Sequence, residues 1–305
     1  MNDPLTAEPM LLDGGLATEI QRAGQSMRAP WWTTRCLLTD ANRRVLRSVH
    51  EAYLAAGARV ITAATFRCTL RSLRQTRLDE AGYAWMVHAA IGVARAARSE
   101  AGIPGALIAG SVGPVEDCYR PDLVPPDDEL AAEHGWLARQ LSRSGVDLFL
   151  IETMNTLREA RIALDQALAV GGRAWVSFVC DEDANLLSGE KLTAAAQAVE
   201  RDGAEAVLVN CTSPSGTETA LRALRAVRSG PVGVYPNIED RRGIEAYRHV
   251  DRYLSPMLSP DEYADLLAAW RADHDVDLLG GCCGSSPAHL AALHRRLSGP
   301  AVGAA

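Results

Sequence analysis

Short apolar runs alternate with longer amphipathic segments along most of this chain. An apolar run of about four to eight residues between turn residues is typical of a buried strand, whereas a helix is longer and repeats its apolar positions every third or fourth residue. By this criterion the candidate strands are residues 10–12, 59–65, 106–110, 146–151, 174–179, 205–209, 231–235 and 276–280.

Helical patterns occupy the intervals between these strands. One helix is predicted after Thr39 and Asp40, which are typical N-cap residues. Its apolar stripe consists of Val45, Leu46, Val49, Tyr53 and Leu54. Residues 127–141 show a second stripe, and a third begins after residues 285–286 at Pro287, because proline is favoured in the first turn of a helix.

A glycine separates helix from strand at three places, in Ala56-Gly57-Ala58, Ser144-Gly145-Val146 and Asp202-Gly203-Ala204. Glycine there supplies the left-handed turn that ends a helix, so its repetition predicts βα units in series and a parallel sheet. Eight such units in 305 residues indicate an α/β fold, a (β/α)₈ TIM barrel. A doubly wound open sheet is the alternative, although no G-x-G-x-x-G follows the first strand.

The chain is expected to form a single domain over residues 1–305, with about 10–298 as its core. No linker or low-complexity stretch divides it, and residues 121–126 are predicted to form a loop over the barrel mouth. The formal net charge of −7 argues against a nucleic-acid partner. No stretch is long and apolar enough to suggest a membrane partner, and the first residues do not resemble a signal peptide, so a cytoplasmic protein is expected.

The most unusual run is Gly280 to Gly284, in which Cys282 and Cys283 are adjacent. A third cysteine, Cys211, follows another predicted strand. If the two strands are neighbours in one barrel, the three sulfurs meet at its mouth. Three protein ligands with an open fourth position are typical of a catalytic zinc site, so Zn²⁺ is the predicted cofactor.

The other cysteines, Cys36, Cys68, Cys118 and Cys180, have no comparable setting and are interpreted as core or surface thiols. A fourth zinc ligand is not evident, because His249, His274 and His289 are interpreted as surface or helix residues.

Polar residues cluster directly after the predicted strands, at the end of a (β/α)₈ barrel where active sites lie. The candidate substrate-binding residues among them are Asp13, Gly14, Thr65, Glu152, Asn210 and Tyr235. Each has a structural explanation when it is taken alone: a turn for Asp13, a helix-dipole contact for Glu152, packing for Tyr235. Because all six lie at the ends of predicted strands, a common substrate-binding site is favoured.

Several of these motifs together resemble one known family. They are Leu12-Asp13-Gly14-Gly15, Gly110-Ser111-Val112-Gly113-Pro114, Glu152-Thr153, Val209-Asn210-Cys211, Tyr235-Pro236-Asn237 and Gly280 to Gly284. The chain resembles the homocysteine S-methyltransferase family over nearly its whole length. The paired cysteines with the preceding Asn-Cys are the most specific part of the resemblance.

The resemblance implies a (β/α)₈ barrel that binds zinc through Cys211, Cys282 and Cys283. It also implies that Asp13 and Glu152 lie where the acceptor amino acid binds. Two positions depart from the family pattern: Ala64 stands where an asparagine is usual, and Asn155 where a proline is usual.

The implied activity is methyl transfer from a small onium donor to the thiol of homocysteine, which gives methionine. A chain that ends soon after the last barrel helix is most similar to members that use S-methylmethionine, or S-adenosylmethionine as a poorer donor. No catalytic side chain is expected beyond the metal-activated substrate thiol.

Two alternatives remain. One is a methyltransferase of the same family with a different thiol or selenol acceptor or a different onium donor. It is suggested by Ala64 and Asn155, which depart from the family pattern. The other is a non-catalytic zinc or redox protein in which Cys282 and Cys283 form a vicinal disulfide.

Overall fold

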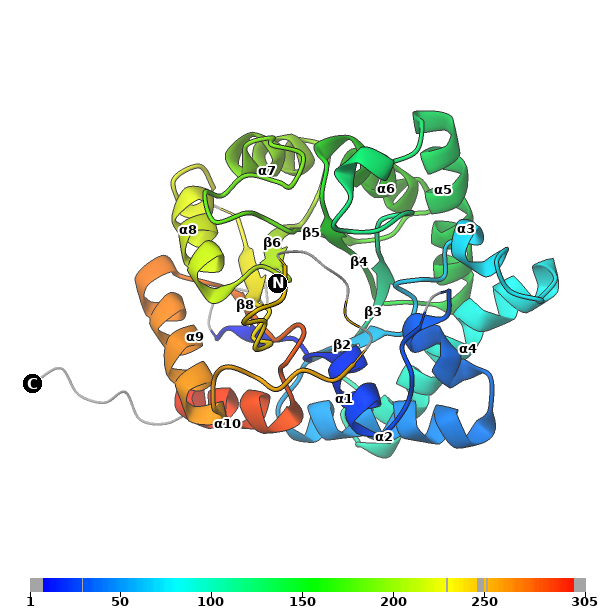
Figure 1. Cartoon of the computed structure of the whole chain (residues 1–305), viewed down its shortest axis with the longest axis horizontal. Coiled ribbons are helices and arrows are strands. Elements are labelled where there is room, and N and C mark those ends of the chain that lie inside the picture. The colour runs from blue at the N-terminus through cyan, green and yellow to red at the C-terminus, as the bar shows by residue number, and fades with distance from the viewer. Residues whose placement is uncertain (1–7, 29, 229, 246–249, 251, 299–305) are drawn as a thin grey trace, which may run out of the picture.

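The computed structural model describes residues 8–28, 30–228, 230–245, 250 and 252–298. Its strands form one parallel sheet that runs around a central axis (Figure 1). The strands are β1 (Met10–Leu11), β2 (Val60–Ala63), β3 (Leu107–Val112), β4 (Leu148–Met154), β5 (Ala174–Phe178), β6 (Ala206–Asn210), β7 (Val232–Tyr235) and β8 (Leu278–Leu279).

Each strand pairs with the next one along the chain from β2 to β8, and β8 pairs with β1. A parallel bridge between Leu12 and Val60 joins the two remaining edges, so that the sheet closes into a barrel. The predicted (β/α)₈ fold is therefore confirmed, and the alternative of an open sheet is wrong.

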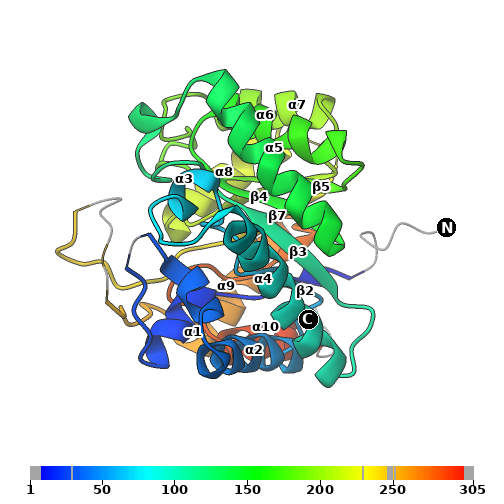
Figure 2. The same cartoon turned by 90° about the vertical axis from the view of Figure 1, so that its right-hand side faces the viewer.

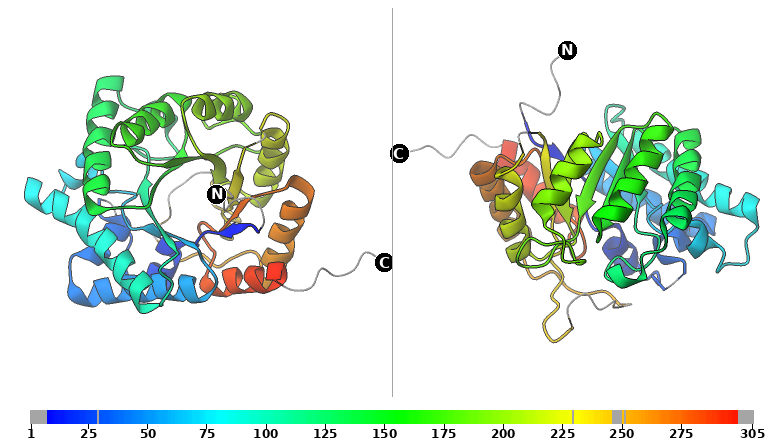
Figure 3. Two further views of the ribbon diagram at one scale, coloured as in Figure 1. Left: turned by 180° about the vertical axis from the view of Figure 1, so that it is seen from behind. Right: turned by 90° about the horizontal axis from the view of Figure 1, so that it is seen from above.

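Helices surround this barrel and alternate with its strands, as the side view and the view from behind also show (Figures 2 and 3). They are α1 (Leu16–Arg22), α2 (Asp40–Ala55), α3 (Leu70–Leu73), α4 (Glu80–Glu100), α5 (Asp127–Ser144), α6 (Leu157–Ala169), α7 (Leu192–Arg201), α8 (Pro214–Arg225), α9 (Pro260–His274) and α10 (Pro287–Ser298). Two short 3-10 helices, η1 (Trp32–Leu37) and η2 (Pro121–Leu123), lie in the connecting segments. None of the helices in the described ranges is long and apolar enough to cross a membrane.

The core has two layers because side chains alternate along each strand. In β4, Leu148 and Leu150 point into the barrel and belong to the small inner cluster. Phe149 and Ile151 point outward and pack in the larger cluster between sheet and helices. The inner layer fills the barrel with apolar side chains below its mouth.

The predicted glycine turns are confirmed, with φ of +111°, +69° and +111° at Gly57, Gly145 and Gly203. Three strands continue further than predicted. Ser111, Glu152 and Asn210 were expected to follow β3, β4 and β6, but they lie within these strands, because backbone pairing continues to Val112, Met154 and Asn210. His249 falls outside the described residues.

Candidate active site

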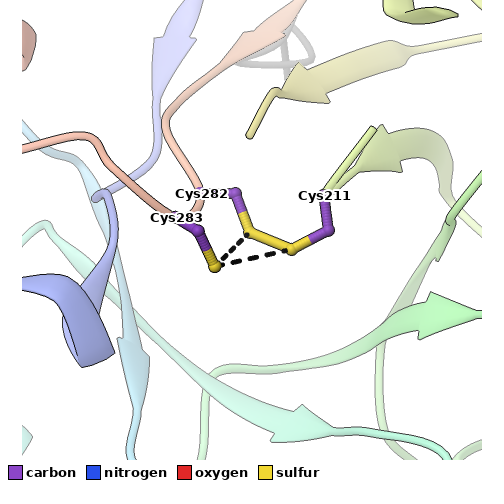
Figure 4. Close-up of side chains that lie close together, drawn as sticks. All are labelled: Cys211, Cys282 and Cys283. Carbon is purple, nitrogen blue, oxygen red and sulfur yellow. Dashed lines mark hydrogen bonds between the residues drawn. A yellow bond between two sulfur atoms is a disulfide. The ribbon is translucent and has the colours of Figure 1, made fainter. Parts of the chain in front are cut away.

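Three cysteine sulfurs meet at the barrel mouth (Figure 4). Cys211 follows β6, and Cys282 and Cys283 follow β8, so the three come from strands that flank β7. All three sulfurs lie within 4.8 Å of one another, and the side chains are half-buried. Cys211 and Cys282 are joined as a disulfide, and the Cys283 Sγ atom lies 3.9 Å from each of their sulfurs.

Backbone hydrogen bonds fix two of these cysteines to the end of β7 and the residue that follows it. The Cys211 N–H donates to the Tyr235 carbonyl at 3.3 Å, and the Cys282 N–H donates to the Pro236 carbonyl at 3.1 Å. Gly284 has φ of +84°, and a Cβ atom there would lie 2.7 Å from the Glu239 nitrogen. The glycine after the cysteine pair is thus required for the tight turn that aims both thiols at one point.

The donor set suits a soft or borderline metal ion. Three thiolates within this spacing can reach one centre and leave a fourth position open, which is the pattern of a catalytic rather than a structural site. Burial raises the pKa of the Cys283 thiol, and the carboxylate of Glu239 raises it further. A bound cation would reverse that effect, because coordination favours the thiolate. The vicinal disulfide of the alternative hypothesis is absent, since the Cys282 and Cys283 sulfurs are 3.9 Å apart.

A cavity of about 210 Å³ opens beside the three sulfurs. Four of the predicted substrate residues line it: Asp13, Gly14, Glu152 and Tyr235. The Asp13 carboxylate accepts hydrogen bonds from the Thr62 N–H at 2.7 Å and from the Thr62 hydroxyl at 2.9 Å. Burial raises the pKa of Asp13 to about 7, and the charge of Glu152 contributes to the rise.

Glu152 forms the other acidic wall of the cavity. Its Oε1 atom accepts from the Ser111 hydroxyl, and its Oε2 atom accepts from the Tyr235 hydroxyl at 3.1 Å. Burial raises its pKa to about 7 although both hydrogen bonds oppose the rise. Two buried carboxyls therefore face one cavity, and neither forms an ion pair with a described residue, which suits a ligand that carries an ammonium group.

The other two predicted substrate residues lie behind this wall. Thr65 donates its hydroxyl proton to the Ser111 carbonyl at 2.8 Å. The Asn210 Oδ1 atom accepts from the Thr153 N–H at 3.0 Å and from the Ser177 hydroxyl at 2.6 Å, and its Nδ2 group donates to the Thr153 hydroxyl at 2.8 Å. Asn210 thus holds Thr153, which has φ of +60° at a register shift directly after Glu152.

The two positions that depart from the family pattern have different settings. Ala64 is buried and lines the cavity directly. Its small side chain leaves more room in the cavity than the asparagine that is usual at this position in the family. Asn155 is fully buried and does not line the cavity; its Nδ2 group donates to the carbonyls of Asp117 and Cys118 at 3.3 and 3.0 Å. It fastens the segment that brings Cys118 and Tyr119 to the cavity wall.

Several cavity residues were missed by the sequence analysis. Cys118 was interpreted as a core or surface thiol, yet it lines the cavity, whereas the predicted loop at residues 121–126 contributes no lining residue among those described. Arg67 and Trp32 also line the cavity. Arg67 lies in the short segment after β2, a signal that could have placed it with the other mouth residues. Trp32 carries no comparable signal, because it lies in the connection between α1 and α2.

Known proteins are similar to this chain over nearly its whole length. A family model described as homocysteine S-methyltransferase matches residues 10–297. The chain belongs to that family. A homocysteine S-methyltransferase of Escherichia coli (strain K12) is 30% identical and covers 97% of this chain and 99% of its own length. A selenocysteine Se-methyltransferase of Brassica oleracea var. italica is 29% identical, with coverages of 94% and 88%.

A solved structure of a homocysteine methyltransferase has the same fold as this chain. The metallated form of the homocysteine methyltransferase MmuM from Escherichia coli superposes with a TM-score of 0.81 at 28% identity, and the match covers 95% of this chain and 97% of that one. The resemblance stated from the motifs is therefore confirmed, and the protein is a methyltransferase. The non-catalytic alternative is set aside by the same findings.

Proposed function

We propose that the protein transfers a methyl group from a small onium donor to the thiol of homocysteine and so forms methionine. The observation that carries this proposal is the meeting of three cysteine sulfurs with two buried carboxyls, Asp13 and Glu152, in one cavity. The sulfurs suit a metal that receives a thiol, and the carboxyls suit the ammonium group of an amino acid. Homocysteine carries both groups.

We infer that the metal is zinc and that Cys211, Cys282 and Cys283 hold it as thiolates. Zinc bound by these residues would favour the deprotonated, nucleophilic form of a substrate thiol. The chain supplies the ligands from the ends of two strands, β6 and β8, and Gly284 allows the tight turn directly after the cysteine pair.

Asp13 and Glu152 are proposed to bind the ammonium group of the acceptor. Each carboxyl is already oriented by protein groups, Asp13 by Thr62, and Glu152 by Ser111 and Tyr235. A cation between them would lower both pKa values from about 7, because its charge offsets the cost of burial. Thr65 and Asn210, which do not line the cavity, would act by positioning Ser111 and Glu152.

The proposed donors are S-methylmethionine and S-adenosylmethionine. When the acceptor sulfur attacks the methyl carbon, the bond from that carbon to the sulfonium sulfur breaks and its electron pair stays on the leaving thioether. The leaving group is neutral and takes no proton, so the reaction needs no general acid. The task of the protein is to align two substrates, which contributes on the order of 7–11 kcal/mol in well-oriented reactions.

A second candidate acceptor is a selenol amino acid. It is favoured by the similarity to the selenocysteine Se-methyltransferase of Brassica oleracea var. italica and by the space that Ala64 leaves in the cavity wall. Both candidates are amino acids, so the same acidic wall would serve them.

A matrix of acceptors and donors separates these functions. Zinc-loaded, reduced protein is incubated with homocysteine, selenocysteine or cysteine, each with S-methylmethionine or S-adenosylmethionine, and kcat/KM is measured for every pair. The proposal expects the highest value for homocysteine with S-methylmethionine. A higher value for selenocysteine would transfer the assignment to the second candidate, and methylation of neither by zinc-replete protein would refute both.

The core bounds 10–298 and a cytoplasmic location stay predictions.

A further inference from the structure

Arg67 is a buried cation on the wall of the cavity. Its side chain is 6% exposed, and it lines the same cavity as Asp13 and Glu152. The guanidinium carbon lies over two aromatic rings, 5.3 Å from the centroid of Trp32 and 5.0 Å from that of Phe66. Such cation–π contacts favour the charged group at this place, while its N–H groups remain the donors for hydrogen bonds.

The hydrogen-bonding capacity of this guanidinium is only partly used. The Nη1 group donates to the Glu116 carbonyl at 2.6 Å and more weakly to the Pro114 carbonyl at 3.5 Å. The Nε group is buried and has no hydrogen-bond partner among the described residues. Arg67 also forms no ion pair within that part of the chain, whereas Arg71 and Arg241 pair with Glu116 and Glu239 at 2.5 and 3.0 Å.

A buried guanidinium without an anion is costly, because its charge is removed from water without compensation. The planar fork of arginine matches a carboxylate, with which it can form two parallel hydrogen bonds. The cavity thus has two kinds of wall: carboxyls that suit a cation, and an unpaired arginine that suits an anion. Such a pair of walls matches an amino-acid zwitterion.

We propose that Arg67 binds the α-carboxylate of an amino-acid substrate of this enzyme. This inference rests on the proposed function, since homocysteine and S-methylmethionine are the two molecules that would bring that group. Both carry an α-carboxylate, so the shared chemistry is an amino-acid carboxylate, and the experiment decides which substrate supplies it.

A purely structural role for Arg67 predicts something different. Its Nη1 group fastens the segment that includes Pro114 and Glu116, which leads to Cys118 and Tyr119 in the cavity wall. Loss of that function would weaken binding of every ligand, with or without a carboxylate. A carboxylate-binding function makes the loss specific to ligands that carry one.

The test compares wild type, Arg67→Gln and Arg67→Lys in kcat/KM with matched substrates. S-methylmethionine is compared with (3-aminopropyl)dimethylsulfonium, and homocysteine with 3-aminopropanethiol; each second compound lacks only the carboxylate. Arg173→Gln is the matched control, because Arg173 pairs with Glu205 in an exposed ion pair. The binding of L-methionine and of 3-(methylthio)propylamine is measured in parallel by calorimetry.

For one of the two substrates, wild type should prefer the carboxylate-bearing form by roughly 30-fold or more, as expected for a buried charged hydrogen-bond pair. Arg67→Gln should abolish that preference, Arg67→Lys should retain part of it, and Arg173→Gln should retain it fully. The substrate whose preference disappears is the one that Arg67 binds. An equal preference in wild type and Arg67→Gln for both substrates overturns the inference while methyl transfer stands. If wild type transfers no methyl group, the proposed function fails, and the calorimetric comparison alone decides the role of Arg67.

Discussion

Asp13 and Glu152 face one cavity from β1 and β4, strands that are not neighbours in the barrel. Burial raises the pKa of each carboxyl to about 7, and the charge of Glu152 contributes to the shift of Asp13. In the absence of a ligand the two carboxyls therefore hold protons at a pH where ordinary carboxyls have lost them. A bound cation would stabilise the charged form of both carboxyls. Their protonation therefore affects the stability of the ligand-free protein and its binding of ligands.

The stability of the ligand-free protein should depend on Glu152 in a defined pH window. Its ordinary pKa is 4.5 and its folded pKa is about 7, so between these values the folded state holds a proton that the unfolded state has lost. Stability from this group is full below the window and falls as pH rises through it, by at most about 1.4 kcal/mol per pH unit for one retained proton.

His50 acts in the opposite direction, because burial lowers its pKa from 6.5 to about 4. The useful quantity is therefore the difference in urea-unfolding free energy between wild type and Glu152→Gln, in which the contribution of His50 cancels. As the pH rises from 5 to 7, the unfolding free energy of wild type should fall relative to that of Glu152→Gln. A difference that is independent of pH would show that Glu152 is ionised throughout.

Substitution of Glu152 by glutamine should lower kcat/KM for homocysteine by roughly 30-fold or more. The amide keeps the shape of the side chain and one oxygen that accepts from Ser111 or Tyr235, while its NH2 group faces the other hydroxyl, and the charge that would pair with the ammonium group is lost. Steady-state kinetics and a melting curve are measured together, with Glu205→Gln as the control because Glu205 lies in an exposed ion pair. Unchanged kinetics in a folded Glu152→Gln variant would remove Glu152 from acceptor binding.

Asn155→Ala should destabilise the fold by about 1–3 kcal/mol, because it leaves the carbonyl of buried Cys118 without its amide donor and removes one of the hydrogen bonds to the half-buried carbonyl of Asp117. It should also raise KM, since Cys118 and Tyr119 line the cavity. Chemical denaturation and steady-state kinetics check both effects. A lower stability with unchanged KM would separate this segment from substrate binding.

Zinc binding should require reduction. The disulfide between Cys211 and Cys282 occupies two of the three sulfurs that would hold the metal. Oxidised protein should hold almost no zinc, and treatment with a phosphine reductant should expose two further thiols and restore about one zinc per chain. Elemental analysis and thiol titration on the same sample give both numbers. Oxidised protein that retains the disulfide and a full equivalent of zinc would contradict the three-cysteine site.

The barrel and the meeting of the cysteines could be predicted from the sequence, because both depend on periodic or adjacent features. Short apolar runs and repeated glycines specify βα units, and strand ends of one barrel necessarily face the same side. Cys211 and Cys282 therefore converge whatever the details of the loops. Asn210 shows the limit of that reasoning: it is the last residue of β6 rather than the residue after it, and its amide is used within the protein to hold Thr153.

Arg67 and Asn155 could not be interpreted from sequence for a different reason. The charge of Arg67 matters because no carboxylate among the described residues pairs with it, and such pairing depends on contacts between distant segments. Asn155 acts through two carbonyls that lie 37 and 38 residues earlier in the chain. Neither relationship has a periodic pattern that a single sequence reveals.

The most direct test of the proposed function follows a labelled methyl group. Reduced, zinc-loaded protein is incubated with homocysteine and S-methylmethionine labelled on its methyl groups, and methionine is analysed by mass spectrometry. The label should appear in methionine with wild type and with Cys180→Ser. Cys180 is the control because it is buried and is not one of the three clustered cysteines. With Cys211→Ser both the label transfer and the bound zinc should be lost. Absence of transfer by wild type that holds one zinc, or equal transfer by Cys211→Ser, would contradict methyl transfer to homocysteine at this site.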